Sequence, residues 1–168
     1  MTYSSSFALR STFFLLAVMF HTAAHAEAKV GDRFGDWVLE CQAVAAEKNI
    51  CALTQAVKKG NRPVLRLRIQ QGSDKKNLEL VAWVPLGIHI PAGVTGAVDK
   101  EKAIPLTVQT CIRAACIATT KLDDSLLKST QSGEKLAISF SLKAGSKPEV
   151  VEVSLKGLTE GLKASNLK

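Results

Sequence analysis

The chain has 168 residues, 46% of them hydrophobic, and carries a formal net charge of +7 at pH 7. This length suits one domain with a sizeable hydrophobic core, and the sequence contains no internal repeat, low-complexity segment or linker to a second domain. The moderate basic balance is compatible with an anionic partner but does not identify one.

The first 26 residues are predicted to be a cleavable signal peptide. Arg10 precedes an apolar run at residues 12–20, and Ala24-His25-Ala26 has the small-x-small pattern that signal peptidase requires. The apolar run is too short for a membrane anchor, which needs roughly 20 residues. We therefore predict cleavage after Ala26, a single mature domain over residues 27–168 with no transmembrane segment, and a periplasmic location. A surface or secreted location is the alternative.

Strand patterns dominate the mature chain. Residues 64–71 alternate most clearly, with Leu65, Leu67 and Ile69 on one face and charged or amide side chains on the other. Residues 136–142 alternate in the same way, which predicts that Leu142 points inward. Further strands are predicted at residues 37–44, 50–57, 78–84 and 151–155, and residues 45–49 are expected to form a turn.

Two short segments have helical patterns. Residues 123–129 begin with Asp123-Asp124, either of which can cap the first turn, and residues 158–164 lie near the C-terminus. Many short strands separated by turn signals, without alternating helices, are typical of antiparallel architectures. We therefore predict an all-β, mainly antiparallel fold, a β-sandwich or barrel-like structure with one or two short helices.

Four cysteines, Cys41, Cys51, Cys111 and Cys116, lie in the mature part. An even number in an exported domain points to disulfides, for which three pairings are possible. We favour Cys41–Cys51 and Cys111–Cys116, because a hairpin centred on Ala46 places residues 41 and 51 opposite each other at a Cα separation of roughly 4.5–5.5 Å. The alternative is a zinc site, but the C-x9-C and C-x4-C spacings do not match common zinc patterns.

Features of an enzyme are sparse in the mature chain. His89 is its one histidine, and alternation with Ile88 and Ile90 predicts an outward side chain on an extended segment. No phosphate-binding glycine loop and no C-x-x-C motif occurs. We therefore expect a non-enzymatic protein without a cofactor or a metal site. A hydrolase built on His89 is the weakest alternative.

The clearest charge feature is a basic region in which Arg66 and Arg68 project from the same strand face. It is a candidate site for anionic polysaccharide, lipid headgroups or a host-surface component. Nucleic acid is disfavoured because no aromatic residues interleave with the charges along the chain. The alternative is a solvated sheet face that discourages edge pairing. The candidate anion-binding residues are Lys58, Lys59, Arg62, Arg66, Arg68, Lys75 and Lys76.

The order of several motifs resembles the invasion-associated locus B family of exported bacterial proteins. F-G-D-W-V-L-E-C at residues 34–41 is similar to the family's opening signature, and S-L-K-G-L at residues 154–158 is similar to its closing segment. Between them lie a P-L-G segment at residues 85–87, P-A-G-V at residues 91–94 and the second cysteine pair. Ala115 replaces an expected glycine before the last cysteine, which predicts a looser turn there.

This resemblance implies a periplasmic or envelope location and, in some members, a part in host-cell invasion. The family carries no established catalytic residues to transfer, and membership does not fix a function. The sequence therefore predicts a non-enzymatic exported protein that binds an envelope or host component. A secreted or surface factor that contributes directly to invasion is the alternative. Trp37 and Phe34 are expected in the core.

Overall fold

A computed structural model describes residues 28–45 and 48–167. The predicted signal peptide, its cleavage site and the centre of the first hairpin turn lie outside these residues. Within the described ranges the chain forms one antiparallel sheet in the order β1-β2-β3-β4-β5-β8-β7-β6-β9-β10. The strands are β1 Arg33–Phe34, β2 Trp37–Ala45, β3 Lys48–Lys59, β4 Arg62–Gln71, β5 Leu78–Val84, β6 Val94–Val98, β7 Ile104–Cys111, β8 Cys116–Leu122, β9 Lys135–Phe140 and β10 Glu149–Ser154.

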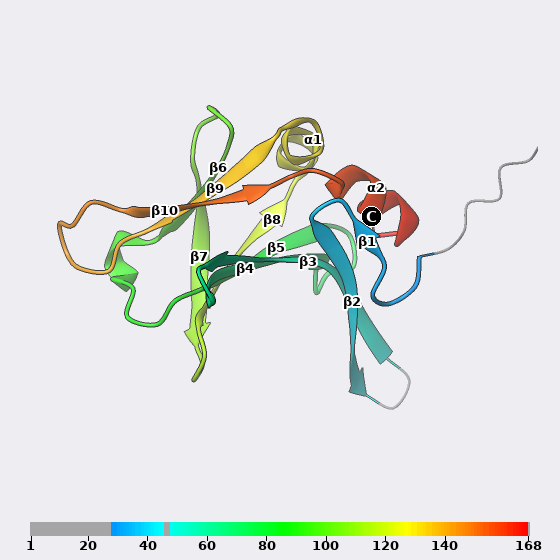
Figure 1. Ribbon diagram of the computed structural model, residues 1–168, viewed down its shortest axis with the longest axis horizontal. Coiled ribbons are helices and arrows are strands. Elements are labelled where there is room, and N and C mark those ends of the chain that lie inside the picture. Colours follow the sequence, from blue (N-terminus) through cyan, green and yellow to red (C-terminus); the bar gives the residue numbers. More distant parts are fainter. Residues whose placement is uncertain (1–27, 46–47, 168) are drawn as a thin grey trace, which may run out of the picture.

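Two short α-helices and one 3-10 turn complete the described part of the chain: η1 Ile90–Ala92, α1 Asp124–Ser132 and α2 Leu158–Ala164. The predicted cap of α1 is confirmed, because the Asp123 carboxylate accepts a hydrogen bond from the Leu126 N–H at 2.8 Å. The two helices lie at the same end of the sheet (Figure 1), and the Thr159 hydroxyl donates to the Gln131 carbonyl at 3.0 Å. No helix among the described residues is long and apolar enough to cross a membrane.

The sheet coils on itself around one core, so the prediction of a mainly antiparallel β fold is confirmed (Figure 1). Strand β7 joins the two parts of the sheet by pairing with β8 through its C-terminal half and with β6 through its N-terminal half. At the closing end, Ser154 of β10 lies against β2 and β3. Its carbonyl accepts hydrogen bonds from Trp37 Nε1 and Gln55 Nε2, each at 3.0 Å, and its N–H donates to Gln55 Oε1 at 3.1 Å.

The opening and closing motifs meet at two glycines. Gly35 and Gly157 both have positive φ, 56° and 86°, and the Asp36 N–H donates to the Lys156 carbonyl at 3.2 Å. A Cβ at Gly157 would overlap the Phe34 carbonyl, and one at Gly35 would overlap the Lys156 carbonyl. Both positions therefore require glycine for conformation and for space.

Both predicted disulfides are present and cross directly opposed strand positions. Cys41 pairs with Cys51 in the β2–β3 ladder at a Cα separation of 4.0 Å, and Cys111 pairs with Cys116 between β7 and β8 at 3.9 Å. The expected looseness at Ala115 is wrong. The Ile112 N–H donates to the Ala115 carbonyl at 2.8 Å, and Ala115 is buried without needing positive φ.

Alternation locates most core residues correctly, with one clear error. Trp37 is completely buried and Phe34 packs partly buried against the core, as predicted. Leu142, predicted to point inward, is 47% exposed, while Ser141 is buried. Strand β9 ends at Phe140, so the period of two no longer applies to the residues that follow.

Candidate functional site

A groove of about 560 Å³ lies over the sheet face turned away from the core. It runs from the β1–β2 turn across β3, β4 and β5 to the β7–β8 turn. Its volume is in the range typical of small-molecule sites. The charged side chains in its lining are Arg33, Asp36, Glu40 and Arg66, and its other lining residues include Val38, Thr54, Ala56, Val64, Trp83 and Pro85.

The floor of the groove depends on small side chains along β3. In the register of the sheet, Ala56 lies opposite Arg66, Thr54 opposite Arg68 and Ala52 opposite Gln70. Because these β3 residues are small, long side chains from β4 can reach across them to β2. Two such bridges form, Arg66 to the Glu40 carboxylate and Arg68 Nη1 to Gln42 Oε1 at 3.4 Å.

The register also shows which β3 residue lies under the Arg66–Glu40 bridge. Glu40 lies opposite Ala52 and Arg66 opposite Ala56, so a line joining their backbones crosses β3 at Thr54. Thr54 is only 4% exposed, although it lies on the outer face. The Arg66–Glu40 ion pair therefore forms a cover over Thr54.

Trp83 supplies the apolar wall of the groove. It lies directly opposite Arg66 in the β4–β5 ladder, and the Arg66 guanidinium carbon is 5.6 Å from the centre of its ring. A guanidinium over an indole at this distance makes a cation–π contact, which orients Arg66. The groove thus combines an aromatic surface with charged groups of both signs, a combination suited to a polar ligand with ring faces.

Two buried polar atoms beneath this layer have no hydrogen-bond partner, Thr54 Oγ1 and Arg68 Nε. Arg68 is 7% exposed. Burial lowers the pKa of Arg68, repulsion from Arg66 lowers it further, and attraction to Glu40 opposes both effects. Arginine nevertheless keeps its charge in proteins, so a buried cation lies beneath the groove.

The predicted basic residues do not form one patch. Lys58, Lys59 and Arg62 are exposed where β3 turns into β4, next to Pro63 and Val64 of the groove lining. Arg66 lines the groove, and Arg68 lies on the same face of β4, as predicted, but outside the lining. Lys75 and Lys76 lie in the β4–β5 turn at the opposite end of β4. The sequence therefore identified one basic rim, one lining residue (Arg66) and the buried Arg68 next to it, together with two lysines remote from the groove.

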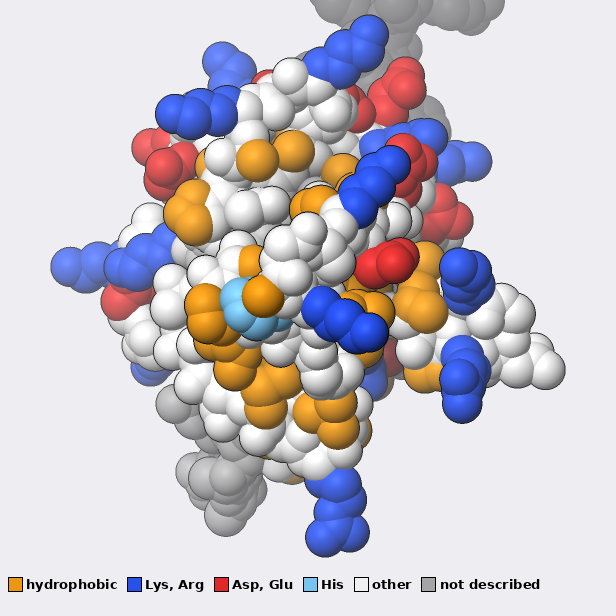
Figure 2. All heavy atoms as spheres, turned by 90° about the vertical axis from the view of Figure 1, so that its left-hand side faces the viewer, with side chains coloured by type: hydrophobic (Ala, Val, Ile, Leu, Met, Phe, Trp, Pro, Cys, Tyr) orange, Lys and Arg blue, Asp and Glu red, His pale blue; other side chains and the backbone are white. Residues whose placement is uncertain are grey.

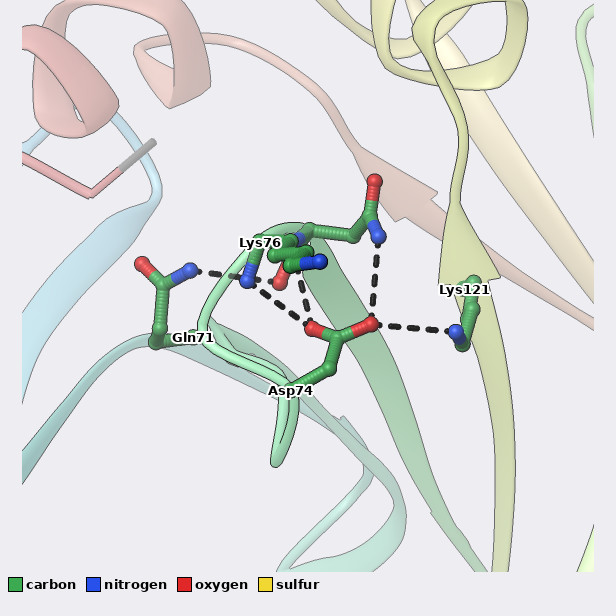
Figure 3. Close-up of polar contacts among 5 residues, drawn as sticks. Gln71, Asp74, Lys76 and Lys121 are labelled. Atoms are coloured by element: carbon green, nitrogen blue, oxygen red, sulfur yellow. Dashed lines mark hydrogen bonds and ion pairs between the residues drawn. The ribbon is translucent and has the colours of Figure 1, made fainter.

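The turn that carries Lys75 and Lys76 is organised by Asp74 (Figure 3). Its carboxylate accepts hydrogen bonds from the Lys76 N–H at 2.9 Å, from Lys121 Nζ at 3.0 Å and from the Asn77 N–H and side-chain amide at 3.2 Å each. These bonds, with that from the Lys76 N–H strongest, hold the pKa of Asp74 well below its ordinary value. These bonds hold the β4–β5 turn in one conformation, so the role of Asp74 is structural.

We expect the stability of Asp74→Asn to depend less on pH in the acidic range than that of the wild type does. A lowered folded-state pKa contributes stability that is present above the unfolded pKa of about 4 and is lost as the pH falls toward the folded value. The melting temperature of the wild type should therefore exceed that of the variant at pH 6, and this difference should shrink steadily below about pH 4. Thermal melts followed by circular dichroism across this range provide the measurement, and a constant difference would contradict the assigned role.

His89 lies elsewhere, on the face that Figure 2 presents, where hydrophobic side chains surround the histidine. The predicted extended backbone is confirmed at His89 (φ −79°, ψ 93°), but the side chain is less exposed than an outward position implies. His89 is half-buried, and its ring Nδ1 is buried without a hydrogen-bond partner. Its backbone N–H donates to the Ser141 carbonyl at 2.7 Å. Ile90 and Leu86, close to it in sequence, are exposed. His89 does not line the groove.

Sequence reasoning missed Glu40, Thr54 and Trp83 as residues of the groove. No aromatic residue interleaves with the basic residues along the chain, but strand pairing brings Trp83 beside Arg66. One signal was available: the hairpin centred on Ala46 already fixes which β3 residues face which β2 residues. The alternation of Ala52, Thr54 and Ala56 then marks a channel of small side chains.

Comparisons with known proteins identify relatives of the whole domain. A relative named Invasion protein B from Bartonella bacilliformis is 25% identical over 148 residues, covering 84% of this chain and 77% of the relative. The crystal structure of invasion associated protein B from Bartonella henselae superposes with a TM-score of 0.70 at 24% identity. It covers 80% of this chain and 93% of that one, and it shows a shared fold. Residues 37–166 match the family described as Invasion associated locus B (IalB) protein, and the chain therefore belongs to this family.

Proposed function

We propose that this protein is a non-enzymatic, exported domain that binds an acidic polysaccharide of the cell envelope in the groove over β2–β5. One observation carries the proposal: a groove with an aromatic wall and paired charges opens beside an exposed basic rim. The two arginines and two carboxylates of the lining balance each other. Lys58, Lys59 and Arg62 add positive charge at one end, which favours an anionic ligand.

A saccharide fits the groove better than a lipid surface does. Membrane headgroups meet a protein over a broad face, whereas Arg66 and Trp83 lie in a groove that an extended chain of sugar rings can enter. Carboxylates and guanidinium groups in the lining can bond sugar hydroxyls, and the indole can pack against a ring face. Anionic vesicles therefore serve as the competing probe in the experiment.

The non-enzymatic part of the proposal rests on the sequence, in which His89 is the one histidine of the predicted mature chain. The lining of the groove includes no histidine. Among the described residues, no cluster of three histidine, cysteine or acidic side chains is arranged to hold a metal ion. The Glu40 carboxylate is engaged in an ion pair with Arg66. Binding without turnover is the simplest chemistry for this arrangement.

The experiment measures binding of the mature domain to polygalacturonate by calorimetry at low salt, with neutral dextran and anionic vesicles as comparison ligands. We expect K58E/K59E to weaken binding to polygalacturonate by at least about tenfold, because two attractions become repulsions at the groove rim. K75E/K76E is the matched control, with the same change in charge at the far end of β4, and should change affinity by less than about twofold.

Three results would overturn the proposal. Equal losses in the two double variants would indicate general charge attraction instead of a site. Binding to vesicles but not to polygalacturonate would indicate a lipid surface. Binding of wild type to neither ligand would remove the basis for an anionic partner.

A direct part in host contact is the second candidate, and the name of the relative Invasion protein B favours it. Cell fractionation separates the two. A pool confined to the periplasm supports the envelope role, whereas a pool at the cell surface or in the medium supports host contact.

A further inference from the structure

Two unpartnered buried atoms belong to residues that face each other at the groove: Thr54 lines it, and Arg68 lies next to Thr54 outside the lining. Thr54 on β3 and Arg68 on β4 are directly opposed in the ladder, and both are more than nine-tenths buried. Thr54 Oγ1 and Arg68 Nε each lack a hydrogen-bond partner. Buried polar groups in folded proteins are almost always bonded, so two such atoms on opposed residues that do not bond each other require an explanation.

The unpaired charge of Arg68 is a second indication that this position takes an anion. Arg66 is neutralised by Glu40, but Arg68 takes part in none of the ion pairs formed by the described residues, and its one side-chain hydrogen bond is a long one to the neutral amide of Gln42. One positive charge thus lies buried without a carboxylate. An unpaired buried cation is costly, and a single anionic group would relieve the cost.

The cover over these atoms is suited to displacement. The side chains of Arg66 and Glu40 are 35% and 39% exposed, and ion pairs at such partly exposed positions are weak. Moving the Arg66 side chain away from Glu40 would uncover Thr54, because the pair crosses β3 at that residue. The freed guanidinium would remain within the groove, available to the incoming ligand.

We infer that Thr54 and Arg68 form an anion subsite for one carboxylate of the acidic saccharide, with the Arg66–Glu40 pair as its displaceable cover. This inference rests on the proposed function. The Thr54 hydroxyl and Arg68 Nε–H donate to the carboxylate, and Glu40 turns toward solvent. The exposed basic rim attracts the polymer, whereas the subsite selects a sugar that carries a carboxylate.

The test follows the Arg68 Nε–H signal by nitrogen-15 NMR while trigalacturonate is added at constant ionic strength. We expect this signal to shift saturably with trigalacturonate and to stay unchanged with the fully methyl-esterified trimer, which lacks the charge. Thr54→Val should weaken binding of trigalacturonate by about 10- to 100-fold, the effect of losing one hydrogen bond to a charged group.

Two controls keep the test decisive. Thr54→Val removes a buried unsatisfied hydroxyl with little change of shape, so the variant should fold with an unchanged or higher melting temperature. Thr95→Val, the same substitution on β6 of the distant part of the sheet, should bind as the wild type does.

The outcomes separate the subsite from the groove. Shifts of the Trp83 indole and Ala56 amide signals without a shift of Arg68, or unchanged affinity in Thr54→Val, would overturn the subsite and leave the groove as the binding site. An equal shift of Arg68 with the esterified trimer would also overturn the subsite. Absence of any shift at Arg68, Trp83 and Ala56 would overturn both the subsite and the proposed function.

Discussion

Gly157→Ala should lower the free energy of unfolding by about 3–5 kcal/mol, one of the two largest effects that we expect from a single substitution. Gly157 has a φ of 86°, which costs an alanine about 1–2 kcal/mol. The added methyl group would also overlap the Phe34 carbonyl, so the contact between the opening and closing motifs would have to separate. Urea unfolding followed by tryptophan fluorescence measures the loss.

Gly145→Ala is the matched control for this prediction. Gly145 also has positive φ, 69°, but no atom lies within 4 Å of the position that a Cβ would take. Its replacement should cost only about 1 kcal/mol, the conformational part alone. Equal losses in the two variants would show that the meeting of the two motifs contributes nothing beyond backbone conformation.

Trp37→Ala should cost about 3–5 kcal/mol, the usual range for a large buried aromatic. Trp37 is completely buried, and its Nε1 donates to the Ser154 carbonyl, so it both fills the core and ties β10 to β2 where the sheet closes. Trp37→Phe keeps most of the volume and leaves the Ser154 carbonyl bonded to Gln55. We expect this milder variant to lose only about 1–2 kcal/mol.

Chemical denaturation of both Trp37 variants tests this account of closure. The order wild type, Trp37→Phe, Trp37→Ala in decreasing stability supports it. A Trp37→Ala variant as stable as the wild type would mean that β10 is held in place by other contacts.

The sequence predicted best where one physical constraint acts locally. A disulfide requires two cysteines at close range, and this requirement gave the register of the β2–β3 hairpin through Cys41 and Cys51. Alternation located the inner face of β4 because that strand is buried on one side. Side-chain chemistry predicted a cap at Asp123 or Asp124, and the structure shows that Asp123 provides it.

Other strands were missed because their burial depends on distant neighbours. Strands β6, β7 and β8 were not predicted: β7 contains Pro105, which weakens a strand pattern, and β8 mixes threonine and lysine with its apolar residues. Leu142 was misplaced because alternation does not reveal where a strand ends.

The groove could be predicted only in part. Arg66 and Arg68 were identified through their shared face, and Lys58, Lys59 and Arg62 through their charge. No sequence pattern singles out Glu40, Thr54 or Trp83. Only the pairing of strands β2 to β5 brings these three residues together. Lys75 and Lys76 were grouped with the others because they are close in sequence, although β4 separates them in space.

The central claim is that the groove over β2–β5 binds an acidic saccharide, and the most direct test is a crystal structure of the mature domain with trigalacturonate. We predict density for sugar rings along Trp83, with the chain leading toward Lys58 and Lys59 at the rim. Trimer bound at another face of the domain, or a groove left empty by a ligand shown to bind in solution, would contradict the account.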